Sequence, residues 1–288
     1  MSDTTEQLPP NAAVDNPSDR DFQYSEISFG AAPVRVKFPR DRLVIQNQGA
    51  DPLMYMSCTR QGICHINNAQ NILEADTQNR TAIFTDPRVL WEERIETRPS
   101  VKALGDSLQA AMDQMLAKKL IAGYAKVNTV EEMIDAIDRG AFIYTGSKEG
   151  DWRYVRETKK YRRRLDDGFA GHAFAGAVDY DLQAREFIAI NSYWPNNGYF
   201  TISFDLIGEL YSKYAIADAR DELAVQAFLA LKKKKQLELT AHSPYSELLI
   251  QLRESTGKLP LFSNYSDAEG ITKEIAEIGI LRNLLNSK

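Results

Sequence analysis

The sequence predicts an α+β protein in which helices and strands occupy separate parts of the chain. Two observations support this class. Helical apolar spacing dominates residues 64–137, and three short apolar strands follow within residues 173–204. Helices that precede a group of strands are typical of segregated α+β lobes, whereas alternating βαβ units would build a parallel sheet. We therefore expect one helical lobe and one antiparallel β lobe.

The first elements are an extended segment and two helices. Apolar and polar side chains alternate over residues 22–48, which predicts extended chain or short strands. Apolar residues recur at helical spacing over residues 64–76, and Gly62 lies just before them, where it would allow a sharp turn. A second helix is expected after Asp86, because Pro87 suits the first position of a helix.

The middle of the chain continues with two helices and a strand. One helix is expected over residues 107–120. The next begins after Thr129, which forms a capping box with Glu132. Gly140 ends that helix, and the apolar residues 141–145 predict a strand. A long charged connection follows.

The second half carries the strands and then returns to helix. The strands are expected at residues 173–178, 187–190 and 199–204. A turn is expected at Val178 to Asp181, and the chain is predicted to be helical from Ala217 onward. Three domains follow from this pattern: a disordered or extended tail over 1–21, a central domain over 22–216, and a helical extension over 217–288.

The bulk composition is that of a globular protein without a broad basic field. The chain has 288 residues, a formal net charge of −5 and 43% hydrophobic residues. This charge excludes a global basic surface for nucleic acid or anionic membranes, and no apolar run reaches transmembrane length. Residues 1–20 have neither a basic start nor an apolar stretch, so no secretory signal is expected. We expect a cytoplasmic or particle-associated protein that binds neither nucleic acid nor membrane.

Reactive chemistry in this chain is expected at a cysteine. Cys58 and Cys64 are too few for a disulfide scaffold, and they lack the Cys-x-x-Cys spacing of thioredoxin-like proteins. His65 is adjacent, but no second Cys/His cluster follows at zinc-site spacing, so neither a metal nor an organic cofactor is expected. Cys64 precedes the helical pattern, and a helix N-terminus stabilises a thiolate. Cys64 is therefore the candidate nucleophile.

Three landmarks occur in order in the second half of the chain. They are Gly171-His172-Ala173 at the start of an apolar strand, Ile190-Asn191-Ser192-Tyr193-Trp194, and Asn197-Gly198-Tyr199-Phe200 at a strand start. Together they resemble the second half of a papain-like cysteine peptidase. In that family, this segment supplies the catalytic histidine, an orienting asparagine and an aromatic cover. The resemblance implies that His172 is the base, Asn191 its orienter, and Trp194 or Tyr193 the cover.

The first half resembles the same family less closely. Cys64 is followed by Ala69, Leu73 and Glu74 at offsets compatible with the family's nucleophile helix. Cys58 is the rival nucleophile, because Ser57-Cys58-Thr59 resembles a variant of microbial members, although its helix would carry Gly62 in the first turns. The resemblance covers about residues 43–205. It implies a papain-like two-lobed fold, to which the helical extension is added.

The family's oxyanion hole uses a glutamine that precedes the nucleophile. Two glutamines qualify, because Gln48 and Gln61 each come before a glycine. Gln48 is favoured, with residues 50–59 looping out between it and Cys64. The resemblance thus implies a catalytic set of Cys64, His172, Asn191 and Gln48.

Two functions remain open from the sequence. The resemblance implies a cysteine peptidase, whose partner is a peptide or protein substrate. The alternative is a catalytically inactive papain-like structural or assembly protein, for example a phage virion or bacterial particle component, that associates through its C-terminal helices. Residues 152–164 interleave basic and aromatic side chains. This segment is either a patch for nucleic acid or an acidic partner, or a solvated insertion beside the cleft, and the insertion is favoured.

Overall fold

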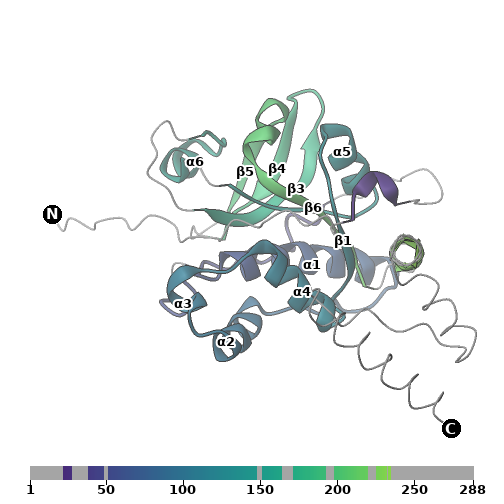
Figure 1. Ribbon diagram of the computed structural model, residues 1–288. Helices are drawn as coiled ribbons and strands as arrows, with labels where there is room; N and C mark the ends of the chain where they lie inside the picture. The colour runs from purple at the N-terminus through teal and green to yellow at the C-terminus, as the bar shows by residue number, and fades with distance from the viewer. Residues whose placement is uncertain are drawn as a thin grey trace, which may run out of the picture. The chain divides into compact units, whose positions relative to one another are not determined.

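The computed structural model describes residues 22–27, 38–48, 51–147, 151–163, 171–192, 198–219, 225–231 and 233–234. The chain divides into a unit spanning Met1–Leu231 and a second unit spanning Lys232–Lys288. Every helix and strand labelled in Figure 1 belongs to the first unit. The predicted N-terminal tail and the helix expected at residues 271–285 lie outside the described residues.

The centre of the first unit is a six-stranded antiparallel sheet with the order β1-β6-β2-β3-β4-β5. The strands are β1 (Ile121–Lys126), β2 (Ile143–Ser147), β3 (His172–Asp181), β4 (Glu186–Ile190), β5 (Tyr199–Ser203) and β6 (Tyr211–Asp218). Strands β3, β4 and β5 follow one another as a meander, and β6 returns to lie between β1 and β2. This sheet, together with the helices, confirms the predicted α+β class.

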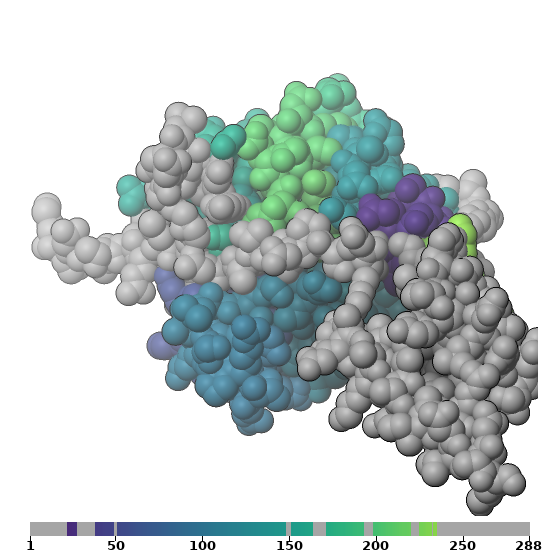
Figure 2. Space-filling model, viewed as in Figure 1, coloured from purple at the N-terminus to yellow at the C-terminus, as the bar shows by residue number. Residues whose placement is uncertain are grey.

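The helices form a separate layer beside this sheet. They are α1 (Cys58–Thr77), α2 (Pro87–Thr97), α3 (Val101–Leu104), α4 (Leu108–Ala117), α5 (Val130–Asp138) and α6 (Trp152–Thr158), with the 3-10 turns η1 (Tyr24–Glu26) and η3 (Phe204–Glu209). Figure 1 shows α1 to α4 together on one side of the strands, while α5 and α6 flank the sheet. Figure 2 shows the same separation, with the blue residues of the helical layer beneath the green residues of the later strands.

Local sequence signals account for the helix starts. Pro87 opens α2, and the Asp86 side chain accepts a hydrogen bond from the Arg88 N–H at 2.8 Å. Thr129 and Glu132 form the predicted capping box at the start of α5. The helices expected after Asp86, over residues 107–120 and after Thr129 are therefore confirmed.

Helix α1 is the central helix and is buried along most of its length. It lies directly on β3: a Cβ at Gly62 would come within 3.0 Å of the Phe174 Cα and of the Tyr144 ring. Only glycine allows this close approach, so the helix and the strand meet backbone to backbone. The first turns of α1 are thereby fixed against the start of β3.

Buried amides fix the middle of α1. Three of them donate to backbone carbonyls: Asn67 to Leu120 at 2.8 Å, Asn71 to Ile83 at 2.7 Å, and Gln70 to both Gly140 at 2.8 Å and Ile216 at 2.7 Å. These carbonyls belong to loops and strands that would otherwise bury an unpaired acceptor, which is costly. The polar side chains of α1 therefore connect it to neighbouring loops and to β6.

Several predicted boundaries are wrong. Helix α1 begins at Cys58 and not at Cys64, and it continues through Gly62. Strand β3 continues through Asp181, so the turn expected at Val178 to Asp181 lies instead at residues 182–185. Strands β1 and β6 and helix α6 were not predicted. In the described parts of residues 22–48, the chain forms a 3-10 turn and irregular structure, with an isolated bridge at Gln23, in place of strands.

The described C-terminal residues differ from the expected helix from Ala217. Ala217 lies in β6, which ends at Asp218, and a helix occupies residues 225–231. Phe228 of this helix is buried, and its ring lies where a Cβ on Gly123 would be, 2.4 Å from the nearest ring carbon. The helix therefore packs on β1. Across the described residues, no helix is both long enough and apolar enough to cross a membrane.

Candidate active site

His172 is the first residue of β3 and is fixed by an asparagine from the next strand connection. Its Nε2 lies 2.9 Å from the Oδ1 of Asn191, which directly follows β4. Asn191 is held in turn by its backbone N–H, which donates to the Gly198 carbonyl at 2.8 Å. A Cβ at Gly198 would lie 2.0 Å from the backbone carbonyl oxygen of Asn191, so glycine is required there. The structure therefore brings His172 and Asn191 together, and their catalytic roles stay a prediction.

The pairing with Asn191 defines which ring nitrogen of His172 can act as a base. An amide oxygen is an acceptor, so the Nε2 that faces it carries the proton. Nδ1 then bears the lone pair that can take a proton. The imidazole is 0% exposed, and burial lowers its pKa to about 4, although the Asn191 hydrogen bond opposes this shift. At neutral pH the ring is uncharged.

Aromatic side chains surround the imidazole. The Trp152 ring, at the start of α6, meets the His172 ring edge-on with centroids 5.0 Å apart, and Phe174 stacks at 6.4 Å. Tyr161 contacts Trp152 at 6.1 Å and shares a hydrogen bond with Ser147, the residue opposite His172 on β2. The basic and aromatic segment therefore packs Trp152 on the histidine and Tyr161 on Trp152, while its described basic residues are exposed.

Cys58 occupies the first position of α1 and faces the strand that carries His172. It is 1% exposed, and burial raises its pKa to about 11. Hydrogen bonds from the backbone of Ala173 and of Thr59 oppose this shift, followed by the charge of Arg60. Only an N–H group of the backbone can stabilise a thiolate in this way. The sulfur therefore lies within hydrogen-bond reach of Ala173, the residue after His172.

Cys64 lies in the second turn of α1 and faces elsewhere. Six residues along a helix correspond to about 9 Å of rise and a rotation of about 120° relative to Cys58. Cys64 is completely buried, and burial raises its pKa well above the usual range, while Arg60 lowers it and Asp86 raises it. The rotation places the Cys64 side chain on a different face of α1 from that of Cys58. The expectation that Cys64 sits at a helix start is wrong.

Gln48 connects the segment before α1 with the segment after β4. Its Nε2 donates to the Tyr55 carbonyl at 3.0 Å, and its Oε1 accepts from the Ser192 hydroxyl at 2.5 Å. Its backbone N–H donates to the Ser192 carbonyl at 2.8 Å. Gln61, the alternative, lies inside α1. Gln48 is therefore held between Tyr55, three residues before Cys58, and Ser192, the residue after Asn191, whereas Gln61 is part of the helix.

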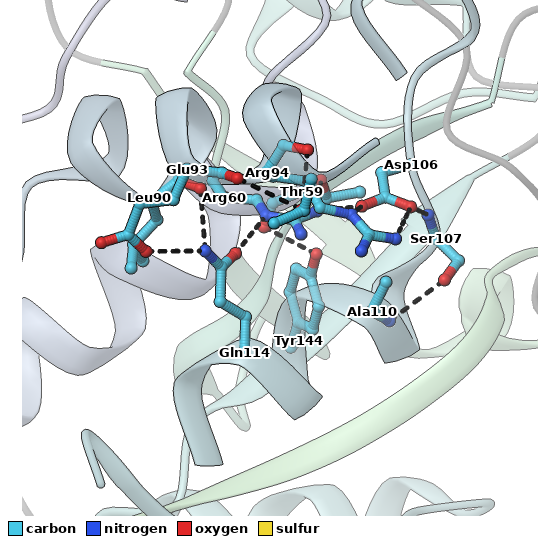
Figure 3. Close-up of polar contacts among 11 residues, drawn as sticks. Thr59, Arg60, Leu90, Glu93, Arg94, Asp106, Ser107, Ala110, Gln114 and Tyr144 are labelled. Carbon is cyan, nitrogen blue, oxygen red and sulfur yellow. Dashed lines mark hydrogen bonds and ion pairs between the residues drawn. The ribbon is translucent and has the colours of Figure 1, made fainter. Parts of the chain in front are cut away.

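A buried polar network lies on the helical side of the first turn of α1 (Figure 3). Arg60 is its centre and donates to Asp106 at 2.7 Å, to Gln114 at 3.0 Å and to Thr59 at 3.1 Å. Arg94 of α2 donates to the same carboxylate at 2.7 Å. This network was not predicted, because its members lie far apart in the sequence and form no motif.

Two features considered from the sequence are an aromatic cover for Asn191 and a metal site. Trp194 and Tyr193, expected to cover Asn191, lie outside the described residues and stay a prediction. Within the described ranges, no group of three or more His, Cys, Asp or Glu side chains is arranged to hold a metal ion.

Comparison with known proteins identifies a shared fold. No protein-family model matches the chain, and no curated protein matches its sequence. Among solved structures, the chain is similar to xylellain, a cysteine protease from Xylella fastidiosa. The TM-score is 0.54 and the identity 15%, covering 73% of this chain and 96% of xylellain. At this identity the likeness shows a common fold, which is papain-like.

Proposed function

We propose that the chain is a cysteine peptidase in which Cys58 is the nucleophile and His172 the base. The observation that carries this proposal is the meeting of two elements. The first turn of α1 brings the Cys58 sulfur to the backbone of Ala173, and the adjacent His172 is held by Asn191 at 2.9 Å. A thiol at a helix start, an imidazole and an orienting amide are the parts that nucleophilic catalysis requires. The fold shared with xylellain supports the same activity.

The proposed reaction starts from neutral partners. With a pKa of about 11 for Cys58 and about 4 for His172, the buried thiol and imidazole are both uncharged at neutral pH. The thiol proton moves to Nδ1 of His172 as the sulfur attacks the peptide carbonyl carbon. The imidazolium then gives this proton to the leaving amine, and a C–N bond breaks. Water next attacks the thioester, releasing the acid and regenerating the thiol.

Asn191 and Gln48 complete the proposed mechanism. Asn191 keeps the proton on Nε2, so that Nδ1 is always the basic nitrogen. The negative oxygen of the tetrahedral intermediate needs donors. The Cys58 backbone N–H and the Nε2 of Gln48 are assigned to it. The Gln48 amide has two hydrogens, and its contact with the Tyr55 carbonyl occupies one of them.

The test is covalent labelling with a peptidyl epoxide, followed by mass spectrometric mapping of the modified cysteine. Wild-type protein and Cys64→Ala should be modified at Cys58, whereas Cys58→Ala should carry no label. His172→Ala should retain the thiol but react much more slowly, because the imidazole no longer takes the proton. Modification of Cys64 in the wild-type protein would assign the nucleophile to the second turn and contradict the proposal.

A non-catalytic papain-like scaffold is the second candidate. Burial of both reacting groups favours it, because Cys58 is 1% exposed and His172 is 0% exposed. A scaffold would remain unlabelled by the epoxide under native conditions, and Cys58→Ala would leave its partner binding and assembly unchanged. Labelling of folded protein at Cys58 would exclude a purely structural role.

A further inference from the structure

We propose that Trp152 of α6 is a positioning residue for the candidate base: its indole fixes the plane of the His172 imidazole and keeps water away from the ring. This inference rests on the proposed role of His172. It goes beyond that role because it gives a function to α6, the helix that lies between β2 and β3 in the chain. Trp152 acts on the reaction through the imidazole and not through the substrate.

The contact between the two rings is close, and both rings are buried. The Trp152 and His172 rings meet at an interplanar angle of 73°, with their centroids 5.0 Å apart. This is the edge-to-face arrangement that aromatic rings prefer, near the short end of its usual range of about 4.5–7 Å. Trp152 is 6% exposed and His172 is 0% exposed. The side of the imidazole that the indole covers is therefore closed to water.

A single hydrogen bond does not fix the plane of a histidine ring. The Nε2 of His172 lies 2.9 Å from the Asn191 Oδ1, which restrains one edge of the ring. The second side-chain torsion of histidine is broad, so the plane could still tilt about this contact. The Trp152 indole packs on the ring at a steep angle, and Phe174 stacks on it at 25°. These two rings restrain the tilt that the hydrogen bond leaves open.

The indole is itself held firmly, as a positioning group must be. It makes edge-on contacts with three further rings, at centroid distances of 5.4 Å to Phe174, 6.0 Å to Phe200 and 6.1 Å to Tyr161. Phe174 lies on β3 and Phe200 on β5. These rings form an apolar cluster with Val155 of α6. The indole is therefore packed between its own helix and the sheet.

Hydrogen bonds attach the end of α6 to the strands around His172. The Thr201 N–H of β5 donates to the carbonyl of Lys159, the C-cap of α6, at 2.8 Å, and the Tyr161 N–H donates to the Thr201 carbonyl at 2.7 Å. The Tyr161 hydroxyl shares a hydrogen bond with Ser147, which lies opposite His172 in the pairing of β2 with β3. The helix that carries the indole is thereby tied to the same strands as the imidazole.

This enclosure affects the charge of the base. Burial is the largest influence on the pKa of His172 and lowers it to about 4. An uncharged imidazole can accept the thiol proton, whereas a charged one cannot. Titratable groups on the segments around the ring are Cys58, Tyr161 and Asp151, the last paired with Arg162. Loss of the indole would let water reach the ring and solvate its charged form, so the pKa of His172 would rise toward 6.5.

The test is an NMR titration of the full-length protein with ¹⁵N-labelled histidine, in which the histidines are His65, His172 and His242. The ring nitrogen shifts report the charge and the tautomer of each histidine, and His172→Ala identifies the His172 signals. In Trp152→Ala, the His172 pKa should rise by about one unit or more, which increases its charged fraction at pH 6 about tenfold. Its single tautomer should become a mixture. Trp152→Phe, which keeps a ring, should titrate close to the wild-type protein.

Two controls separate a local effect on His172 from a general loss of packing. His65 is also buried, in α1, and its pKa is also lowered to about 4. Damage to the fold would shift both histidines, whereas loss of the cover should shift His172 alone. Trp91→Ala removes an indole of the same size that is 0% exposed in α2, and it should leave the His172 signals unchanged.

Trp152→Val serves if Trp152→Ala does not fold, and it should give the same shift with a smaller size. An unchanged His172 pKa and tautomer in the folded variant would overturn the proposal, as would an equal shift of His65. Epoxide labelling of Cys58 should be slower in the variant than in Trp152→Phe, and equal rates would also overturn it. A wild-type protein that takes no label would refute the peptidase proposal instead, and the titration would still decide whether Trp152 holds the ring.

Discussion

The two cysteines of α1 differ in their surroundings although both are buried in the same helix. Cys58 begins the helix and receives hydrogen bonds from the backbone of Ala173 and Thr59, which partly offset the effect of burial on its pKa. For Cys64, six residues or about 1.7 turns later, burial is the main influence on the pKa and the Asp86 charge is a further unfavourable one. Its pKa is raised further. Under the proposed function, position along the helix favours Cys58 over Cys64 as the nucleophile.

The difference has a simple physical origin. The first N–H groups of a helix have no intrahelical partner, and the helix dipole is positive there, so a thiolate is stabilised. In the second turn, the N–H groups are already bonded to preceding carbonyls. Cys64 is thus a small hydrophobic residue of the core, whereas Cys58 lies where the core meets the strand of His172.

The largest expected effect is on catalysis by the two alanine variants. Cys58→Ala should lower kcat/KM for a peptide substrate by at least ~10³-fold, because the nucleophile acts as a unit with its base. Cys64→Ala should keep kcat/KM near the wild-type value and lose only stability. Steady-state kinetics with circular dichroism as a folding control checks both. A larger loss of activity in Cys64→Ala would reverse the assignment.

Asn191→Ala should have the next largest effect. Without the Asn191 Oδ1, the His172 ring can rotate or protonate at the wrong nitrogen. The loss in kcat should be smaller than the ~10²–10⁴-fold that general acid–base catalysis supplies, with KM little changed. The kinetics of Asn191→Ala and His172→Ala, measured side by side, test this ranking. Unchanged kcat in Asn191→Ala would contradict an orienting role.

The pH dependence of the unfolding free energy tests the burial of His65, the residue after Cys64. His65 is 2% exposed, its ring nitrogens have no hydrogen-bond partner among the described residues, and burial lowers its pKa from 6.5 to about 4. The unfolded chain therefore binds more protons between these pH values, and stability falls as pH drops from 6.5 toward 4. The loss should be up to about 3 kcal/mol for this group.

Urea unfolding at several pH values measures this loss. His172 has the same shift, so wild-type protein should lose the contribution of both histidines. His65→Leu should lose only that of His172, about half as much. Equal acid sensitivity in His65→Leu and the wild-type protein would show that His65 is not held neutral.

The smallest effect is expected from Gly62→Ala, between the two cysteines. Its Cβ would meet the β3 backbone, so the variant should lose roughly 1–3 kcal/mol of unfolding free energy through overpacking. Activity should fall as Cys58 moves away from His172. Gly208→Ala is the matched control, because nothing lies within 4 Å of a Cβ there. Equal stability of the two variants would contradict the close packing of α1 on β3.

Local signals in the sequence predicted much of the fold. The Pro87 start, the Thr129 capping box and the apolar runs of β3, β4 and β5 depend on neighbouring residues, and the structure confirms them. Strand β6 was missed because it pairs with β1 and β2 from distant parts of the chain. Helix α6 was missed because its charged residues outnumber the apolar residues that pack on the sheet.

In the candidate site, the His172–Asn191 pair could be predicted from the sequence, but the start of α1 could not. His172 begins β3 and Asn191 directly follows β4, the next strand of the sheet, so their order in the sequence indicated their pairing. The helix start expected at Cys64 was wrong because Gly62 was interpreted as a turn residue before the helix; the choice between Cys64 and Cys58 as nucleophile stays a prediction. In the structure Gly62 is a helical residue, and its missing side chain serves the contact with Phe174. A contact across the fold leaves no local signature. Ser57 was the signal that could have placed the helix start at Cys58, because serine is favoured at the N-cap position.

The central claim is that the sulfur at the start of α1 faces the imidazole of β3. A crystal structure measures this most directly, through the separation of the Cys58 Sγ and the His172 Nδ1. The proposal predicts a separation near hydrogen-bond reach, about 3–4 Å, with the Cys64 Sγ much farther from the ring. A Cys64 Sγ closer to Nδ1 than the Cys58 Sγ would contradict it.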